Sequence, residues 1–193
     1  MLRIMRKLGR ADGAEIAEAA VVLPVLFTFL LGIIWFGRAF NIYSTITQAA
    51  QQGAATAARP ACATCPTGAD VWNSTSFPGD ATVANSVCSV MKASSINASQ
   101  IMVSPAVTYQ PCPAPAPANN CTTITTDVCT DGGGKNITIC RSVLLNPTGS
   151  PPSRAQCGTV VSFQYPFQMN LPFTSLNMQQ IVLKAQAQSR MEN

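Results

Sequence analysis

Residues 19–37 read AAVVLPVLFTFLLGIIWFG and contain no charged side chain. A helix needs roughly 20 residues to span the hydrocarbon core of a bilayer, so this run has the length of one transmembrane helix. Trp35 lies near its far end, where aromatic side chains favour the membrane–water interface. The stretch therefore predicts a single membrane-spanning helix.

The charges on either side of this run predict its orientation. Arg38 follows it closely, whereas four basic residues precede it: Arg3, Arg6, Lys7 and Arg10. Because positive charge is retained in the cytoplasm, we expect a cytoplasmic N-terminus and a periplasmic or extracellular C-terminal part. A cleaved secretory signal peptide shares the basic start and the apolar core. We favour a retained helix, since the run is longer than a typical signal segment and no small-x-small site follows closely.

Helical periodicity continues beyond the apolar run. Side chains recur at three- and four-residue spacing in a stripe that tapers from rings to alanine: Phe36, Phe40, Tyr43, Thr47, Ala50, Ala54 and Ala57. Gln48, Gln51 and Gln52 populate the opposite side, and Pro60 ends the pattern. We expect one helix from Ala19 to Ala58, with its second half packed against a domain outside the membrane.

Beyond Pro60 the sequence is typical of a small α+β domain. Period-two alternation over 160–169 and 181–188 predicts half-buried strands, and 136–145 is a further candidate. Residues 101–109 suggest another strand, which Pro105 limits to an edge or a break. Asp80 is expected to cap a second helix whose buried face is Val83, Ala84, Val87, Cys88, Val90 and Met91. The predicted fold is a long transmembrane helix packed on a small antiparallel sheet.

All cysteines follow the apolar run: Cys62, Cys65, Cys88, Cys112, Cys121, Cys129, Cys140 and Cys157. An even number outside the cytoplasm predicts structural disulfides, and the sequence does not choose among the possible pairings. A thioredoxin-like motif would begin a helix that follows a strand, whereas Cys62 and Cys65 precede the turn residues Pro66 and Gly68. A four-cysteine zinc site would need a second close pair, so we predict no metal site.

Composition disfavours several function classes. The chain contains no histidine, the commonest general base and a common metal ligand. Its scattered carboxylates have no partner that would tune them, so we expect neither an enzyme nor a cofactor. No Lys/Arg stripe interleaved with aromatics exists, which disfavours nucleic acid as a partner.

The segment before the apolar run carries the sharpest signal. A cut after Gly13 would make Glu18 the fifth residue of the remaining chain, at the edge of the bilayer, where an unpaired carboxylate is expensive. Alternatively, Glu15 and Glu18 only complement the dipole of the helix's first turn. The arrangement resembles the leader of type IV prepilins and pseudopilins. That resemblance implies cleavage by a prepilin peptidase after Gly13, Ala14 as the new N-terminus, and Glu18 as the carboxylate that pairs with a neighbouring subunit during assembly.

The segments 15–24 and 34–40 narrow the resemblance to the TadE-like family, with an acidic-apolar start, a Leu-Pro pair and a Gly-Arg after the membrane run. The alanine-rich helix to Ala58 and the C-terminal part, 160–191, are similar as well, whereas the cysteine-rich middle departs from the family. The resemblance implies a minor pilin-like subunit of tight-adherence (Flp-type) pilus assembly in the inner membrane. Its partners would be other pilin-like subunits and the assembly machinery.

The expected organisation has three parts: a cytoplasmic basic leader (1–13), a transmembrane and extended helix (14–59), and a cysteine-rich α+β domain (60–193). Two other functions stay open. A membrane-anchored, disulfide-rich binding module would need neither cleavage at Gly13 nor helix-mediated assembly. An envelope thiol oxidoreductase would use Cys62 and Cys65, and is the least favoured.

Overall fold

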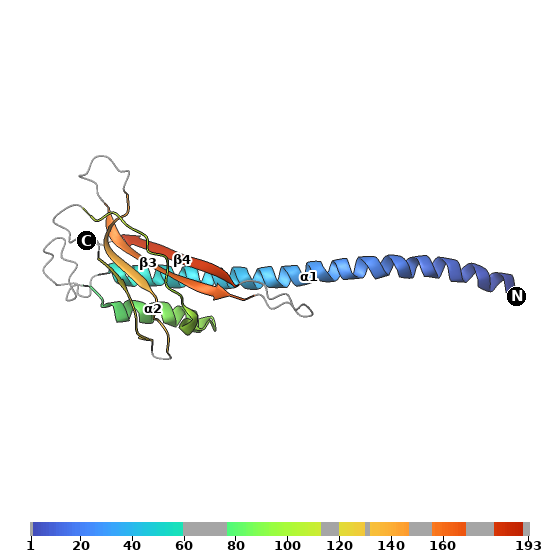
Figure 1. Cartoon of the computed structure of the whole chain (residues 1–193), viewed down its shortest axis with the longest axis horizontal. Coiled ribbons are helices and arrows are strands. Elements are labelled where there is room, and N and C mark those ends of the chain that lie inside the picture. The colour runs from blue at the N-terminus through green and yellow to red at the C-terminus, as the bar shows by residue number, and fades with distance from the viewer. Residues whose placement is uncertain are drawn as a thin grey trace. The chain divides into compact units, whose positions relative to one another are not determined.

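A computed structural model describes the fold, and it has the predicted α+β class (Figure 1). The chain divides into an N-terminal unit, Met1–Asn41, and a C-terminal unit, Ile42–Asn193. The structure describes the backbone of residues 2–59, 77–112, 120–129, 132–146, 156–168 and 180–190, with side chains from Glu15 onward. The residues Cys62 and Cys65 lie outside these ranges.

Helix α1 runs from Leu2 to Ala58. It ends at the residue predicted from Pro60, and it begins earlier than the predicted Ala19, before the basic residues. Pro24 lies inside it and has no N–H to offer the carbonyl of Ala20, yet the helix continues. The expectation of one long helix is confirmed.

Residues 42–58 of α1 supply one wall of the core of the C-terminal unit. Ile46, Ala49, Ala50, Ala54 and Ala57 are completely buried there, and the three glutamines predicted on the opposite side are exposed. The predicted stripe is correct only in its alanine half. Phe36, Phe40 and Tyr43 on that stripe are 47% to 75% exposed, and within the C-terminal unit the buried face is instead continued by Thr45 and Ile46.

Helix α2 spans Asp80–Ala93 and buries the predicted face, with Val90 only partly covered. The prediction that Asp80 caps this helix is wrong. Gly79 is the N-cap, and Asp80 lies in the first turn with its carboxylate paired to the guanidinium of Arg141. Arg141 also donates a hydrogen bond to the carbonyl of Pro78 (2.7 Å), so this side chain fastens its own segment to the start of α2.

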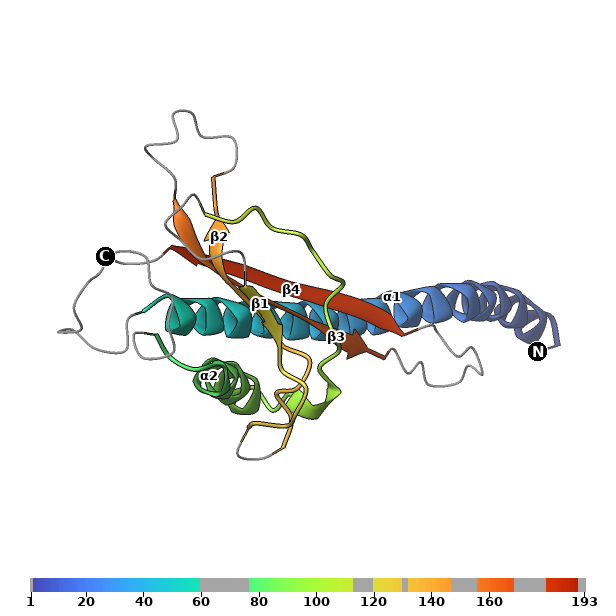
Figure 2. The ribbon, with the colours of Figure 1, turned by 60° about the vertical axis from the view of Figure 1, so that its left-hand side comes forward.

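In the described part of the chain, four antiparallel strands form one sheet in the order β1-β2-β3-β4, all labelled in Figure 2. They are β1 Asn120–Thr123, β2 Thr138–Leu144, β3 Cys157–Phe167 and β4 Ile181–Arg190. Strands β2, β3 and β4 match the predicted segments, whereas β1 was not foreseen. Its four residues are too few to show alternation.

Strand β3 is buried on both faces, although its alternation predicts burial on one. Val161, Phe163 and Tyr165 face the core between the sheet and the helices. Val160 lies on the other face, in a small cluster with Cys140 and Val143 against which Tyr109 packs. The segment that contains Tyr109 therefore covers the outer face of the sheet.

That covering segment is not the strand predicted over 101–109. It makes single bridges at its two ends, Met102 to Gln164 and Pro111 to Val143, and no strand in between. Pro105, which cannot donate to a ladder, explains why the pairing does not extend. The two ends instead hold the segment across the sheet.

At Gly53, α1 lies close against two neighbouring elements. A Cβ built on this residue would lie 2.6 Å from Cγ2 of Val87 on α2 and 3.5 Å from Cγ1 of Val161 on β3. Val87 and Val161 are themselves completely buried. Glycine is therefore required where the two helices and the sheet meet.

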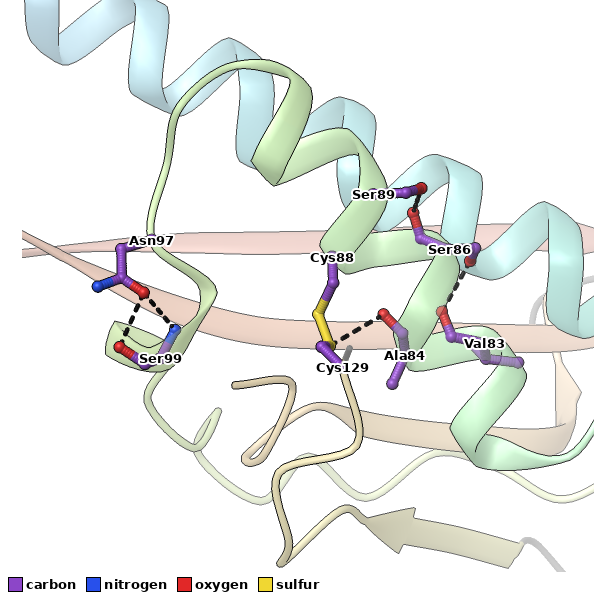
Figure 3. Close-up of a disulfide and its surroundings, with 8 residues drawn as sticks. All are labelled: Val83, Ala84, Ser86, Cys88, Ser89, Asn97, Ser99 and Cys129. Atoms are coloured by element: carbon purple, nitrogen blue, oxygen red, sulfur yellow. Dashed lines mark hydrogen bonds between the residues drawn. A yellow bond between two sulfur atoms is a disulfide. The ribbon is translucent and has the colours of Figure 1, made fainter. Parts of the chain in front are cut away.

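Six of the eight predicted cysteines form three disulfides in the described part of the chain: Cys88–Cys129, Cys112–Cys157 and Cys121–Cys140. The first fastens α2 to the β1–β2 connection, as Figure 3 shows. The second fastens the covering segment to the start of β3, and the third joins directly opposed residues of β1 and β2.

Removal of the Cys112–Cys157 disulfide by double alanine substitution is expected to lower the free energy of unfolding by about 2–4 kcal/mol. The bond joins residues 45 apart and therefore restricts the unfolded chain strongly. Urea denaturation of the protein in detergent measures this loss. Removal of Cys121–Cys140, 19 residues apart, should cost about 1 kcal/mol less on the same chain-entropy argument. A clearly larger loss for the shorter loop would contradict that account.

Candidate functional site

The side chains of α1 from Glu15 to Phe40 are the candidate site in the N-terminal unit. Leucine, valine, isoleucine and phenylalanine dominate the run, and in a globular core they would be covered. Here most of the large apolar side chains are about half to three-quarters exposed, from 47% at Val22 to 75% at Phe36, and Leu31 and Trp35 are partly buried. The helix is long and apolar enough to cross a membrane, judged by length and composition. Such a surface indicates a single-pass membrane anchor.

Polar groups lie at both ends of this apolar surface. Glu15 and Glu18 are exposed at its start. Arg38 lies at the other end, with its guanidinium carbon 5.7 Å from the ring centre of Trp35. A cation over an aromatic face at the membrane boundary is favourable, because the ring remains apolar while the charge reaches water.

A shallow groove crosses the apolar surface between these ends, lined by Thr28, Phe29, Gly32, Ile33, Phe36 and Gly37. The Thr28 hydroxyl donates to the carbonyl of Val25 (2.7 Å), so its polar group is satisfied within the helix. A Cβ added at Gly32 or at Gly37 would meet no atom within 4 Å. Unlike Gly53, these two glycines are therefore not required by packing within the described chain.

Glycine inside a helix costs roughly 1 kcal/mol relative to alanine. In the sequence, Gly32 belongs to the apolar run and Gly37 to the Gly-Arg pair of the TadE-like resemblance, and the occurrence of both among large side chains is a visible signal. Small residues in membrane helices allow another helix to approach closely. The groove is therefore the part of α1 best shaped to receive a partner.

The predicted processing and assembly residues all lie on α1. Gly13 and Ala14 are within its helical backbone. Glu18 is exposed, and it has no ion-pair partner among the side chains that the structure describes. The structure therefore leaves the Glu18 carboxylate accessible to another chain.

The C-terminal unit holds a cavity beside the Cys88–Cys129 disulfide. Ser89, Lys92, Asn97 and Gly132 contribute to its lining, and Asn97 Oδ1 accepts hydrogen bonds from the backbone N–H and the hydroxyl of Ser99 (Figure 3). In the described ranges, no three acidic, histidine or cysteine side chains gather in a way that could hold a metal ion.

Burial raises the pKa of the Tyr109 and Tyr165 phenols. Tyr165 donates a hydrogen bond to Oε1 of Gln100 (2.9 Å) and stays protonated at neutral pH. The side chain is part of the packing between β3 and the residues that follow α2. Its phenol therefore has a structural partner.

The family described as TadE-like protein matches residues 13–55. This segment is TadE-like. The match confirms the resemblance inferred from the acidic start, the Leu-Pro pair and the Gly-Arg, and it covers the apolar surface, the groove and most of the buried face of α1. No curated protein and no solved structure matches the chain.

Proposed function

We propose that the protein is a minor pilin-like subunit of a tight-adherence (Flp-type) pilus assembly system. Its role is structural: α1 packs with the helices of other pilin-like subunits in the inner membrane, and the C-terminal unit initiates, caps or stabilises the fibre. No catalytic step is involved. The observation that carries the proposal is the apolar surface of α1, which lies within the TadE-like segment and is uncovered in the described chain.

Helix-mediated assembly is supported by the contrast among the glycines of α1. Gly53 is needed for packing inside the C-terminal unit, whereas Gly32 and Gly37 have open space around them. Glycine weakens a helix, so the presence of two glycines in the groove is explained if another helix lies against them. A passive anchor in lipid would need only bulky apolar side chains at these positions.

The proposed organisation follows from this role. Residues 1–13 form a basic cytoplasmic leader, 14–59 form the transmembrane and extended helix, and 60–193 form a periplasmic or extracellular domain. The basic residues before the apolar run support the orientation. The disulfides of the C-terminal unit support it too, since such bonds persist in oxidising compartments.

A prepilin peptidase is proposed to cut between Gly13 and Ala14. Glu18 would then lie close to the new N-terminus, near the start of the apolar surface. A carboxylate at that depth is costly unless it is paired, and the N-terminal amine of a neighbouring subunit would supply the opposite charge. The exposure of Glu18 is compatible with such a contact.

Intact-mass spectrometry of the membrane-extracted protein tests the cleavage. We expect a chain that begins at Ala14 and retains everything after it. Substitution Gly13→Leu should leave the leader attached, and Gly9→Leu, in the same helical leader, should not. Functional, assembled protein that retains Met1 would remove the main support for the proposal.

A further inference from the structure

Strand β4 is at one end of the sheet order β1-β2-β3-β4, so one of its edges has no neighbouring strand within the described residues (Figure 2). It is ten residues long, against four for β1 at the other end. A long edge strand presents a row of unpaired N–H and C=O groups, and proteins usually shield such a row. Only alternate residues of β4 direct their backbone N–H and C=O groups to this edge.

The pairing of β3 determines which residues of β4 direct their backbone groups outward. Gln164 and Met102 exchange two backbone hydrogen bonds, of 2.8 and 2.9 Å, so the backbone groups of Gln164 point away from β4. The side to which the backbone N–H and C=O groups point alternates from one residue of a strand to the next, and the β3–β4 register has no bulge. The backbone groups of Phe163 and Tyr165 therefore point toward β4, where they face Ala185 and Leu183.

The even-numbered residues of β4 consequently direct their backbone groups outward: Val182, Lys184, Gln186, Gln188 and Arg190. Their side chains lie on the outer face of the sheet and are exposed, whereas Ala185 and Ala187 are buried in the core. No backbone hydrogen bond from the rest of the described chain reaches the even-numbered residues. We call these five residues the β4 edge.

The β4 edge carries positive charge and no acid. Lys184 and Arg190 have no ion-pair partner among the described side chains, and the residues opposite them on β3 are Gln164 and Gly158. The two cations are separated along the strand by about 20 Å at roughly 3.4 Å per residue. At the other end, Val182 and Ile181 are 39% and 47% exposed.

We propose that the β4 edge binds an extended segment of another protein by strand addition, with acidic residues six positions apart opposite Lys184 and Arg190. Backbone hydrogen bonds to the β4 edge would hold the segment. The positive charges of Lys184 and Arg190 would favour an acidic segment over a neutral or basic one. A second copy of this chain is disfavoured as the occupant. If two β4 strands paired about Gln186, Lys184 of each copy would lie diagonally beside Arg190 of the other, and like charges repel.

The binding test uses the full-length protein in detergent micelles and a fluorescent nine-residue peptide. Its antiparallel register places glutamate opposite Arg190 and Lys184, threonine opposite Gln188 and Gln186, and valine opposite Val182. Fluorescence anisotropy should show saturable binding, and Lys184→Glu should weaken it about tenfold. A peptide with lysine in place of both glutamates should bind Lys184→Glu more tightly than it binds the wild-type protein.

Two matched pairs separate strand addition from simple charge attraction. Peptide N-methyl groups on the amides that face β4 should abolish binding, and the same groups on the alternate amides should not. In the protein, Gln186→Pro removes an outward N–H and should weaken binding at least about tenfold with the melting temperature nearly unchanged. Ala187→Pro removes a hydrogen bond to β3 and should lower the melting temperature.

Equal binding of the two methylated peptides would overturn the proposal, as would wild-type affinity in Gln186→Pro. Absence of any binding by the wild-type protein would also overturn it. Binding of the peptide to the β4 edge depends neither on contacts of α1 with other subunits nor on cleavage at Gly13. Its failure would therefore leave the pilin-like role intact, and failure of that role would leave the β4 edge intact.

Discussion

Substitution Gly53→Leu is expected to lower the melting temperature of the C-terminal unit by about 6–12 °C. A Cβ at this position already meets Cγ2 of Val87 at 2.6 Å, and leucine adds three further carbons in the same place. Val87 is stiff and completely buried, so α1 must move away from α2 or distort. Overpacking of this kind costs about 3 kcal/mol, and 1 kcal/mol shifts the melting temperature of a unit of this size by about 2–4 °C.

Two other leucine substitutions on α1 are the controls, and near-ultraviolet circular dichroism of the protein in detergent is the measurement. Gln52→Leu introduces the same side chain on the exposed side and should leave the melting temperature within about 2 °C of the wild-type value. Gly32→Leu, in the groove, should do the same. If Gly53→Leu melted like these controls, α1 and α2 would not pack as closely as the structure indicates.

Much of the fold could be predicted from the sequence because the relevant signals are local. Pro60 cannot continue a helix, and α1 ends at Ala58. The period-two alternation that starts near Val160 and Ile181 locates β3 and β4. The TadE-like segment was recognisable from the residues around Pro24 and Arg38, and the family match confirms it.

The remainder depends on contacts between distant residues, which no local pattern records. Aspartate is a common N-cap residue, yet the carboxylate of Asp80 pairs with Arg141, 61 residues later. The pattern around Tyr109 predicts a strand, but the ring of Tyr109 packs on the outer face of the sheet. The disulfide partners were likewise set by the sheet register, as at Cys121 and Cys140.

The same limit applies to the candidate site. The apolar surface and Glu18 could be found in the sequence, because a membrane helix is recognisable from length and composition. The distinction between Gly53 and Gly32 could not, since both are glycines in one helix. Only the structure shows that one faces Val87 and the other faces open space.

Substitution Glu18→Ala is expected to reduce incorporation of the protein into pilus assembly complexes by at least about tenfold, while membrane insertion persists. Alanine lowers the free-energy cost of placing the helix in the bilayer, so membrane insertion of α1 should become more favourable. What is lost is the proposed pairing with a neighbouring N-terminal amine, and loss of a desolvated charge pair costs about 2–5 kcal/mol. Because about 1.4 kcal/mol corresponds to a factor of ten, even the lower value gives a large loss.

Glu15→Ala is the matched control, because Glu15 is exposed on the same helix one turn earlier. Co-purification with cross-linked pilin-like subunits, normalised to the amount in the membrane fraction, measures both variants. The leader must be removed equally in both, which intact mass establishes, so that a defect reflects assembly and not cleavage. Wild-type incorporation of Glu18→Ala would instead favour the membrane-anchored binding module, for which α1 is only a tether and the C-terminal unit carries the function.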